Sequence, residues 1–148
     1  MLNEDYKEIL QLLLNNKVSF LVVGAYAMGA HGYPRATGDF DIWVEATAEN
    51  AKKIYKTLCE FGAPLFEVTE KTFSKEGIVL QIGVAPRRID FITHIDGVDF
   101  SKAYKTKEII EVEKLRIPFI SKRNLIKNKQ STGRKKDKLD VDYLKKRT

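Results

Sequence analysis

The sequence is poor in cysteine and contains no long apolar stretch. Its single cysteine, Cys59, excludes an internal disulfide and cannot build a thiolate metal site alone. No apolar run reaches the roughly 20 residues that a membrane-spanning helix needs. The acidic, amphipathic start MLNEDYKEIL does not resemble a cleaved signal. We therefore expect a cytoplasmic protein with no membrane partner.

Positive charge is scarce in the first two thirds of the chain and concentrated in the last third. Residues 1–100 hold 10 Lys and Arg against 14 Asp and Glu, a net charge of −4. Residues 101–148 hold 16 against 6, a net charge of +10. Such a basic surface suits a polyanion, either a nucleoside triphosphate or a nucleic acid. A solvated, Lys-rich helix face is the alternative.

The pattern of apolar residues predicts one α/β domain, because 148 residues can bury one sizeable core but not two. Helical periodicity predicts helices over residues 3–16, 25–32, 48–61, 122–130 and 135–147. Alternating or continuous apolar runs predict strands over residues 19–24, 39–45, 77–84 and 87–95, and a hairpin over 108–120. We expect a loop over residues 96–105. The main unit would span residues 1–120, with a basic helical tail, residues 121–148, packed on the same domain.

Two aspartates, Asp39 and Asp41, share one predicted strand in the stretch RATGDFDIWV. Side chains alternate along a strand, so both carboxylates lie on one face and repel each other unless a cation lies between them. A third acid, Asp90, lies in the apolar strand RIDFIT, where burial without a partner is costly. Three carboxylates on neighbouring strands could hold two Mg²⁺ ions, which prefer oxygen ligands. A solvated polar face is the alternative.

The segments VVGAYAMGAHGYPRATGDFDIWV and RIDFIT together resemble the nucleotidyltransferase superfamily with the DNA polymerase β-like palm. The likeness is to its small bacterial members, which are related to abortive-infection toxins and minimal nucleotidyltransferases. Their pattern joins a glycine turn after an apolar strand, a short helix ending in His-Gly, Arg-x-Thr-x-Asp-x-Asp, and a later third acid. The matching residues are Gly24, Ala27, His31, Gly32, Arg35, Thr37, Asp39, Asp41 and Asp90. The tail ISKRNLIKNKQSTGRKKDKLDVDYL resembles their closing element at Lys129, Gly133, Arg134, Asp137 and Asp140.

The resemblance implies a mixed α/β palm, in which helices flank a small, partly antiparallel sheet and a short helical tail closes it. It also implies metal-dependent transfer of a nucleoside monophosphate from a nucleoside triphosphate (NTP) to a hydroxyl acceptor on RNA, a protein or a small molecule. Asp39 and Asp41 would bind two Mg²⁺ or Mn²⁺ ions, and Asp90 would complete the site for the ion that activates the acceptor. The protein could act with a toxin or antitoxin partner, or in phage defence.

The nucleotide would be bound by residues of the glycine turn, the loop before the acids and the tail: Gly24, Ala25, Arg35, Thr37, Lys129 and Arg134. Position 25 is Ala where the family usually has Gly or Ser, so a side-chain hydroxyl is absent while the backbone N–H remains. Arg35 and Thr37 could equally brace their loop. Arg134 could instead pair with Asp137 or Asp140.

Two other side chains near these motifs, those of His31 and Trp43, could have structural rather than functional roles. His31, at a predicted helix end, is expected to form a structural hydrogen bond rather than to act as a base. Trp43 shares the face of the acids, where it could stack on a base or pack beneath the C-terminal helices.

Two functions of other classes fit parts of the sequence. The basic tail and Ala25 also suit a non-catalytic protein of this fold that binds RNA or a partner protein. Its RNA binding would be sensitive to salt and independent of metal. A sugar transferase that uses Asp-x-Asp with Mn²⁺ is less favoured, because no nucleotide-sugar architecture fits a chain of this length.

Overall fold

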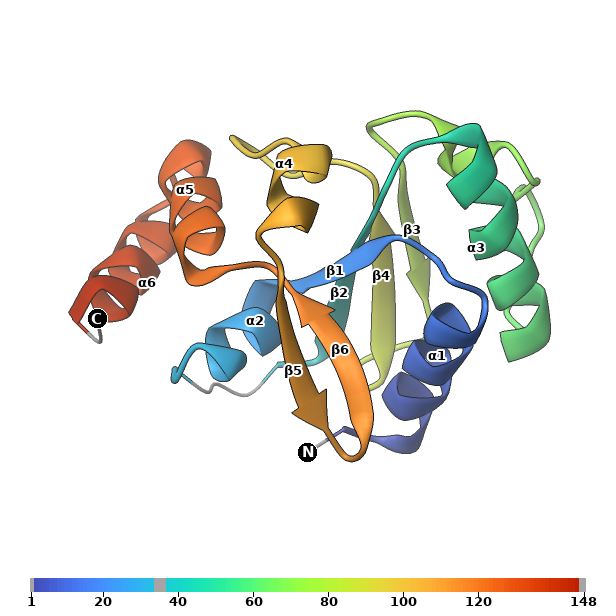
Figure 1. The fold of residues 1–148 in the computed structure, drawn as a ribbon, viewed down its shortest axis with the longest axis horizontal. Helices are drawn as coiled ribbons and strands as arrows, with labels where there is room; N and C mark the ends of the chain where they lie inside the picture. Colours follow the sequence, from blue (N-terminus) through green and yellow to red (C-terminus); the bar gives the residue numbers. More distant parts are fainter. Residues whose placement is uncertain (1, 34–36, 147–148) are drawn as a thin grey trace.

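A six-stranded mixed sheet forms the centre of the computed structural model, which describes residues 2–33 and 37–146 (Figure 1). The strands are β1 (Phe20–Val23), β2 (Asp39–Val44), β3 (Val79–Ile82), β4 (Arg88–Ile92), β5 (Glu108–Val112) and β6 (Leu115–Phe119). Their order across the sheet is β3-β4-β2-β1-β6-β5. The pairs β1–β2, β3–β4 and β5–β6 are antiparallel, whereas β2–β4 and β1–β6 are parallel. The predicted fold class, a partly antiparallel sheet flanked by helices, is confirmed.

Helices lie on either side of the sheet, with α1 and α3 on one side and α2, α4, α5 and α6 on the other (Figure 1). Their bounds are α1 (Glu4–Asn15), α2 (Gly24–Ala30), α3 (Ala48–Phe61), α4 (Phe100–Lys105), α5 (Lys122–Thr132) and α6 (Lys135–Lys146), with a short 3₁₀ helix, η1 (Thr72–Ser74). All five predicted helices are present. None of the helices in the described residues is both long and apolar enough to cross a bilayer.

Strand β2 divides its side chains between the core and the opposite face. Phe40, Ile42 and Val44 are buried in the core. The ring of Tyr6, from α1, stacks on Phe40 with 4.7 Å between centroids. The strand thus anchors alternate residues in the core and presents Asp39 on the opposite face, as the period of two requires.

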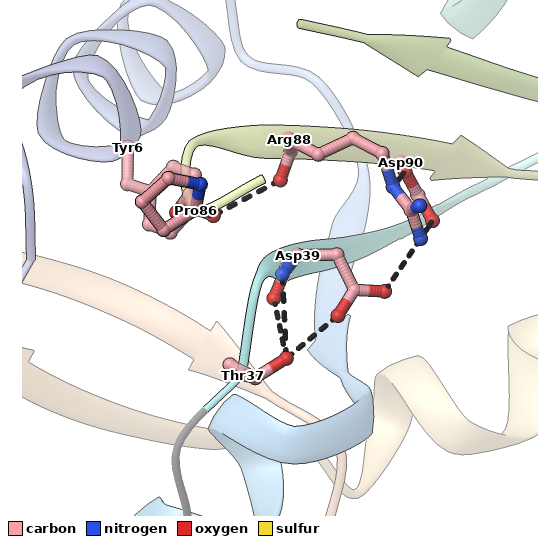
Figure 2. Close-up of polar contacts among 6 residues, drawn as sticks. All are labelled: Tyr6, Thr37, Asp39, Pro86, Arg88 and Asp90. Carbon is pink, nitrogen blue, oxygen red and sulfur yellow. Dashed lines mark hydrogen bonds and ion pairs between the residues drawn. The ribbon is translucent and has the colours of Figure 1, made fainter. Parts of the chain in front are cut away.

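The hydroxyl of Tyr6 ties α1 to the beginning of β4. Its oxygen lies 3.1 and 3.0 Å from the carbonyl oxygens of Pro86 and Arg88, which share its one proton as acceptors (Figure 2). Burial is the main cause that raises the pKa of Tyr6 to about 12, so the hydroxyl stays protonated and remains a donor. This contact fixes the start of the strand that carries the third acid.

The prediction of a loop over residues 96–105 is wrong for its second half, which forms the helix α4. Asp99 caps the helix, because its side chain accepts a hydrogen bond from the backbone N–H of Lys102 at 3.2 Å. Phe100 is buried and packs edge-on against Trp43, with ring centroids 5.0 Å apart. Trp43 therefore packs beneath α4, which is neither of the two positions the sequence suggested.

The two C-terminal helices pack against each other and join the core through a few apolar residues. Leu125 of α5 and Leu144 of α6 are both buried in the core cluster. Gly133, with φ of +72°, allows the turn between the helices. The division into a unit over residues 1–120 and a tail over 121–148 stays a prediction.

A buried amide connects α3 to one end of the antiparallel β1–β2 pair, where β1 begins and β2 ends. Asn50 is 3% exposed, and its Oδ1 accepts a hydrogen bond from the backbone N–H of Ser19 at 2.8 Å. Its Nδ2 donates to the carbonyl oxygens of Ser19 and Glu45, both at 3.0 Å. The side chain thus bonds to three backbone groups, of which the two carbonyl oxygens also accept from the backbone N–H groups of Glu45 and Thr47.

We expect Asn50→Ala to lower the free energy of unfolding by about 2–4 kcal/mol, because it removes three hydrogen bonds of a buried amide and takes from the backbone N–H of Ser19 its Asn50 acceptor. Urea unfolding followed by circular dichroism would measure the change. Asn128→Ala is the control, since that amide makes one exposed hydrogen bond, to the carbonyl oxygen of Asp96, and should cost less than about 1 kcal/mol. Equal losses in the two variants would contradict the prediction.

Candidate metal and nucleotide site

The sheet brings the three predicted acids together. In the parallel pair β2–β4, Asp41 is the direct partner of Asp90, and Asp39 is the partner of Arg88. One carboxylate oxygen from each acid lies within 4.8 Å of those of the other two. The predicted association of Asp39, Asp41 and Asp90 follows from the register of two strands that are 49 residues apart at Asp39 and Arg88.

Arg88 is the cation that the sequence analysis did not assign to the site. Its Nε and Nη2 donate to the two carboxylate oxygens of Asp90, at 3.0 and 3.1 Å. Its Nη2 also donates to Oδ2 of Asp39, at 3.1 Å (Figure 2). The spacing of Arg88 and Asp90, two residues apart on one strand, was the available signal that both side chains share the acid face.

The two acids on β2 have pKa values that are shifted in opposite directions. Burial, followed by the charges of Asp39 and Asp90, raises the pKa of Asp41 to about 7. Burial acts in the same direction on Asp39, but a hydrogen bond from Thr37 and the charge of Arg88 outweigh it and lower the pKa of Asp39. Near neutral pH the metal-free site therefore holds a charged Asp39 beside a partly protonated Asp41.

The loop before β2 braces the first acid. The Thr37 hydroxyl donates to Oδ1 of Asp39 at 2.6 Å, and also lies 3.2 Å from the carbonyl oxygen of Asp39 (Figure 2). This is the loop-bracing role that the sequence left open for Thr37, although the residue also lines the pocket. Arg35, the other predicted nucleotide ligand of this loop, lies outside the described residues.

The turn from β1 into α2 passes very close to the second acid. Gly24 has φ of +70°, which favours glycine, and a Cβ at this position would clash with Oδ2 of Asp41. Val23 precedes the helix and supplies no capping side chain. The turn thus places backbone next to a carboxylate in a way that only glycine permits.

A pocket of about 250 Å³ joins the glycine turn and the acids to the two C-terminal helices. It is lined by Gly24, Ala25, Thr37, Asp39, Asp41, Lys129, Arg134, Lys136 and Asp137. The structure therefore gathers five of the six predicted nucleotide ligands, Arg35 being undescribed, around Asp39 and Asp41. Lys136 also lines the pocket. The sequence did not predict this, because nothing distinguishes Lys136 from the many other lysines of the tail.

Two cations of the tail, Lys129 and Arg134, are paired with buried acids. Lys129 Nζ lies 2.9 Å from Oδ2 of Asp140 and 3.4 Å from Oδ1 of Asp137. Arg134 Nε lies 2.7 Å from Oδ2 of Asp137, the ion pair that the sequence offered as an alternative to nucleotide binding. The Asp137 side chain is 3% exposed, whereas that of Arg134 is 72% exposed. The remaining hydrogen-bond donors of Arg134 can therefore still face a ligand.

His31 has the structural role that its position predicted. Its Nε2 lies 2.8 Å from the carbonyl oxygen of Ile120, and its Nδ1 lies 3.4 Å from Oε2 of Glu108. These contacts attach the end of α2 to β5 and to the segment that follows β6.

The acid cluster has the chemistry of a divalent-cation site. All its donors are carboxylate oxygens, which Mg²⁺ and Mn²⁺ prefer. The Arg88 guanidinium already binds two of the three carboxylates, which shows that a cation is accommodated there. Burial and the charges of Asp39 and Asp90 raise the pKa of Asp41 despite the opposing charge of Arg88, so a second cation would further favour the ionised acids. Asp39, Asp41 and Asp90 therefore fit such an ion.

Solved structures identify the fold. No protein-family model matches the sequence, and no curated protein is detectably similar to it in sequence. A candidate nucleotidyltransferase from Thermotoga maritima is 19% identical with a TM-score of 0.65, covering 99% of this chain and 96% of that one. The lincosamide antibiotic adenylyltransferase LnuA, with lincomycin bound, is 16% identical with a TM-score of 0.62, covering 100% and 99%. The chain thus has the nucleotidyltransferase fold, as the sequence resemblance predicted.

We expect Asp41→Asn to stabilise the metal-free protein at high pH. The raised pKa means that ionisation of Asp41 opposes folding, so stability is lost as the pH rises from about 4 to about 7. The variant lacks this loss and should exceed the wild type by about 1–3 kcal/mol at about pH 8, and by little near pH 4. Urea unfolding in EDTA across this range would measure the difference. The control Asp142→Asn, at an exposed position of α6, should show no such trend.

We expect Gly24→Ala to disturb Asp41 as well as the backbone. Gly62, with φ of +84° and no atom within 4 Å of the place where an alanine Cβ would lie, is the matched control for strain alone. Gly62→Ala should cost about 1 kcal/mol. Gly24→Ala should cost more and should also weaken Mn²⁺ binding, measured by titration calorimetry. Equal Mn²⁺ affinity in both variants would contradict the close approach at Gly24.

Proposed function

We propose that this protein is a metal-dependent nucleotidyltransferase, which moves a nucleoside monophosphate from an NTP to a hydroxyl acceptor. The observation that carries the proposal is the convergence of three carboxylates within 4.8 Å of one another, two of which, those of Asp39 and Asp41, line a pocket together with basic residues of the tail. The fold supports the same reaction class by analogy.

The sheet side of the pocket would hold the divalent cations. Asp39 and Asp41 would bind both ions, and Asp90 would complete the site near the acceptor. Bound Mg²⁺ or Mn²⁺ would lower the pKa of the acceptor hydroxyl and neutralise charge on the phosphates. The chain itself fixes the carboxylates: β2 and β4 set their spacing, and Thr37 orients Asp39.

The helical side of the pocket would bind the triphosphate. Lys129 is held in place by Asp137 and Asp140, and Arg134 keeps donors free while it pairs with Asp137. Backbone groups of Gly24 and Ala25 would face the phosphates across the pocket. These contacts would orient the α-phosphate towards the carboxylates.

In the reaction, the acceptor oxygen would form a bond to the α-phosphorus and its proton would pass to solvent. The bond from the α-phosphorus to the bridging oxygen would break, and pyrophosphate would leave with that electron pair. Catalysis would depend on positioning and electrostatic stabilisation.

ATP is the first nucleotide to test, because LnuA is named an adenylyltransferase. The acceptor, whether RNA, a protein or a small molecule, is left open by this proposal. A place in a toxin–antitoxin or phage-defence pair stays a prediction from the sequence resemblance.

The proposal can be tested without knowledge of the acceptor. We expect each productive NTP, in the presence of Mg²⁺, to stabilise the wild-type protein by roughly 2.7 kcal/mol at about 100 times its Kd. The shift should disappear in Asp39→Asn/Asp41→Asn, because the ligands of the metal are lost. Thermal unfolding with each of the four NTPs, with and without Mg²⁺, would measure it.

The charge-matched control is Glu67→Gln/Glu70→Gln, at two exposed positions of the segment between α3 and η1. It should keep the full Mg-NTP shift. Equal shifts in this control and in the aspartate variant would disprove the site. Salt-sensitive RNA binding that ignores metal and the acids would instead support the non-catalytic alternative.

A further inference from the structure

The guanidinium of Arg88 uses the carboxylate oxygens that a metal ion would need. It binds both oxygens of Asp90 and Oδ2 of Asp39, all at 3.0–3.1 Å. Within the described residues it makes no hydrogen bond to Asp41. A divalent cation shared by the three acids would therefore compete with Arg88 for at least two of its ligands.

The position of Arg88 is fixed by the sheet, but its side chain is not buried. Its backbone pairs with Asp39, and its carbonyl oxygen accepts a hydrogen bond from Tyr6. The side chain is 35% exposed, so the guanidinium can leave the carboxylates without disturbing the core. Backbone anchoring and an exposed head group together allow one residue to be either paired or displaced.

We infer that Arg88 is an internal counterion, which holds Asp39 and Asp90 at ligand spacing in the metal-free protein and is displaced when a divalent cation binds. This inference rests on the metal site of the proposed function. Arg88 is thus a positioning residue: it limits repulsion among the acids while the site is empty of metal, and it lowers the affinity for metal by competition.

The chain offers a matched control in the preceding residue. Arg87 carries the same charge and forms an ion pair with Asp5, at 3.4 Å, through a side chain that is 53% exposed. Asp5 belongs to α1, the helix whose Tyr6 packs on Phe40 at the face of β2 opposite Asp39 and Asp41, so this pair lies away from the three acids. Arg87→Gln changes the net charge as Arg88→Gln does but leaves the carboxylate contacts intact.

The test measures Mn²⁺ binding, by titration calorimetry and by electron paramagnetic resonance, at about pH 8 in physiological salt without nucleotide. We expect Arg88→Gln to bind Mn²⁺ about tenfold more tightly than the wild type, because the competing charge-assisted hydrogen bonds are gone. The same variant should unfold at a lower temperature in EDTA and gain more from Mn²⁺. Arg88→Lys keeps the charge without the bidentate geometry and should bind with intermediate affinity.

The outcomes separate this inference from the proposed function. Tighter Mn²⁺ binding in both Arg88 variants, with wild-type affinity in Arg87→Gln, supports displacement. Wild-type or weaker affinity in the Arg88 variants makes Arg88 a structural ion pair only and overturns the inference, while the metal site stands.

If Arg87→Gln binds Mn²⁺ as tightly as Arg88→Gln does, the change in net charge alone explains the tighter binding, and the inference is overturned. If the wild type binds no Mn²⁺, the metal site itself is wrong. Should Arg88→Gln fail to fold, Arg88→Lys decides alone.

Discussion

Repulsion among three carboxylates on adjacent strands is the constraint on which the polar structure of this protein depends. Asp39, Asp41 and Asp90 place oxygens within 4.8 Å of one another, a separation at which like charges raise each other's pKa. Arg88 and Thr37 relieve the repulsion at Asp39, but burial, together with the charges of Asp39 and Asp90, still raises the pKa of Asp41 to about 7. The protein therefore maintains an arrangement that disfavours its own ionised form, which is typical of a site built for a ligand.

The hydrophobic core supplies the rigidity that this arrangement needs. Phe40 lies between the two acids of β2 and points to the opposite side, where it stacks on Tyr6. The same Tyr6 holds the start of β4 through its hydroxyl. One aromatic residue of α1 thus fixes both strands, so the spacing of Asp41 and Asp90 is determined by packing and by the parallel register rather than by the acids themselves.

The parts of the structure that follow from local periodicity could be predicted from the sequence, and the parts that depend on distant partners could not. The shared face of Asp39 and Asp41 follows from strand alternation, and the long amphipathic helices follow from their apolar spacing. Helix α4 was missed because six residues with two buried apolar side chains carry little periodic signal. Arg88 was missed because its partner Asp39 lies 49 residues away, on a strand whose register the sequence does not specify.

The basic C-terminal third shows why net charge alone identifies a site poorly. Two of its cations, Lys129 and Arg134, are paired with Asp137, and Lys129 also with Asp140. Because burying these acids costs much of the Coulomb energy that the pairs gain, the pairs contribute more to geometry than to stability. They hold Lys129 and Arg134 in the lining of the pocket that Asp39 and Asp41 also line. A ligand with both a cation and phosphates would therefore find complementary charges within this one pocket, whereas a nucleic acid backbone alone would meet repulsion from the acids.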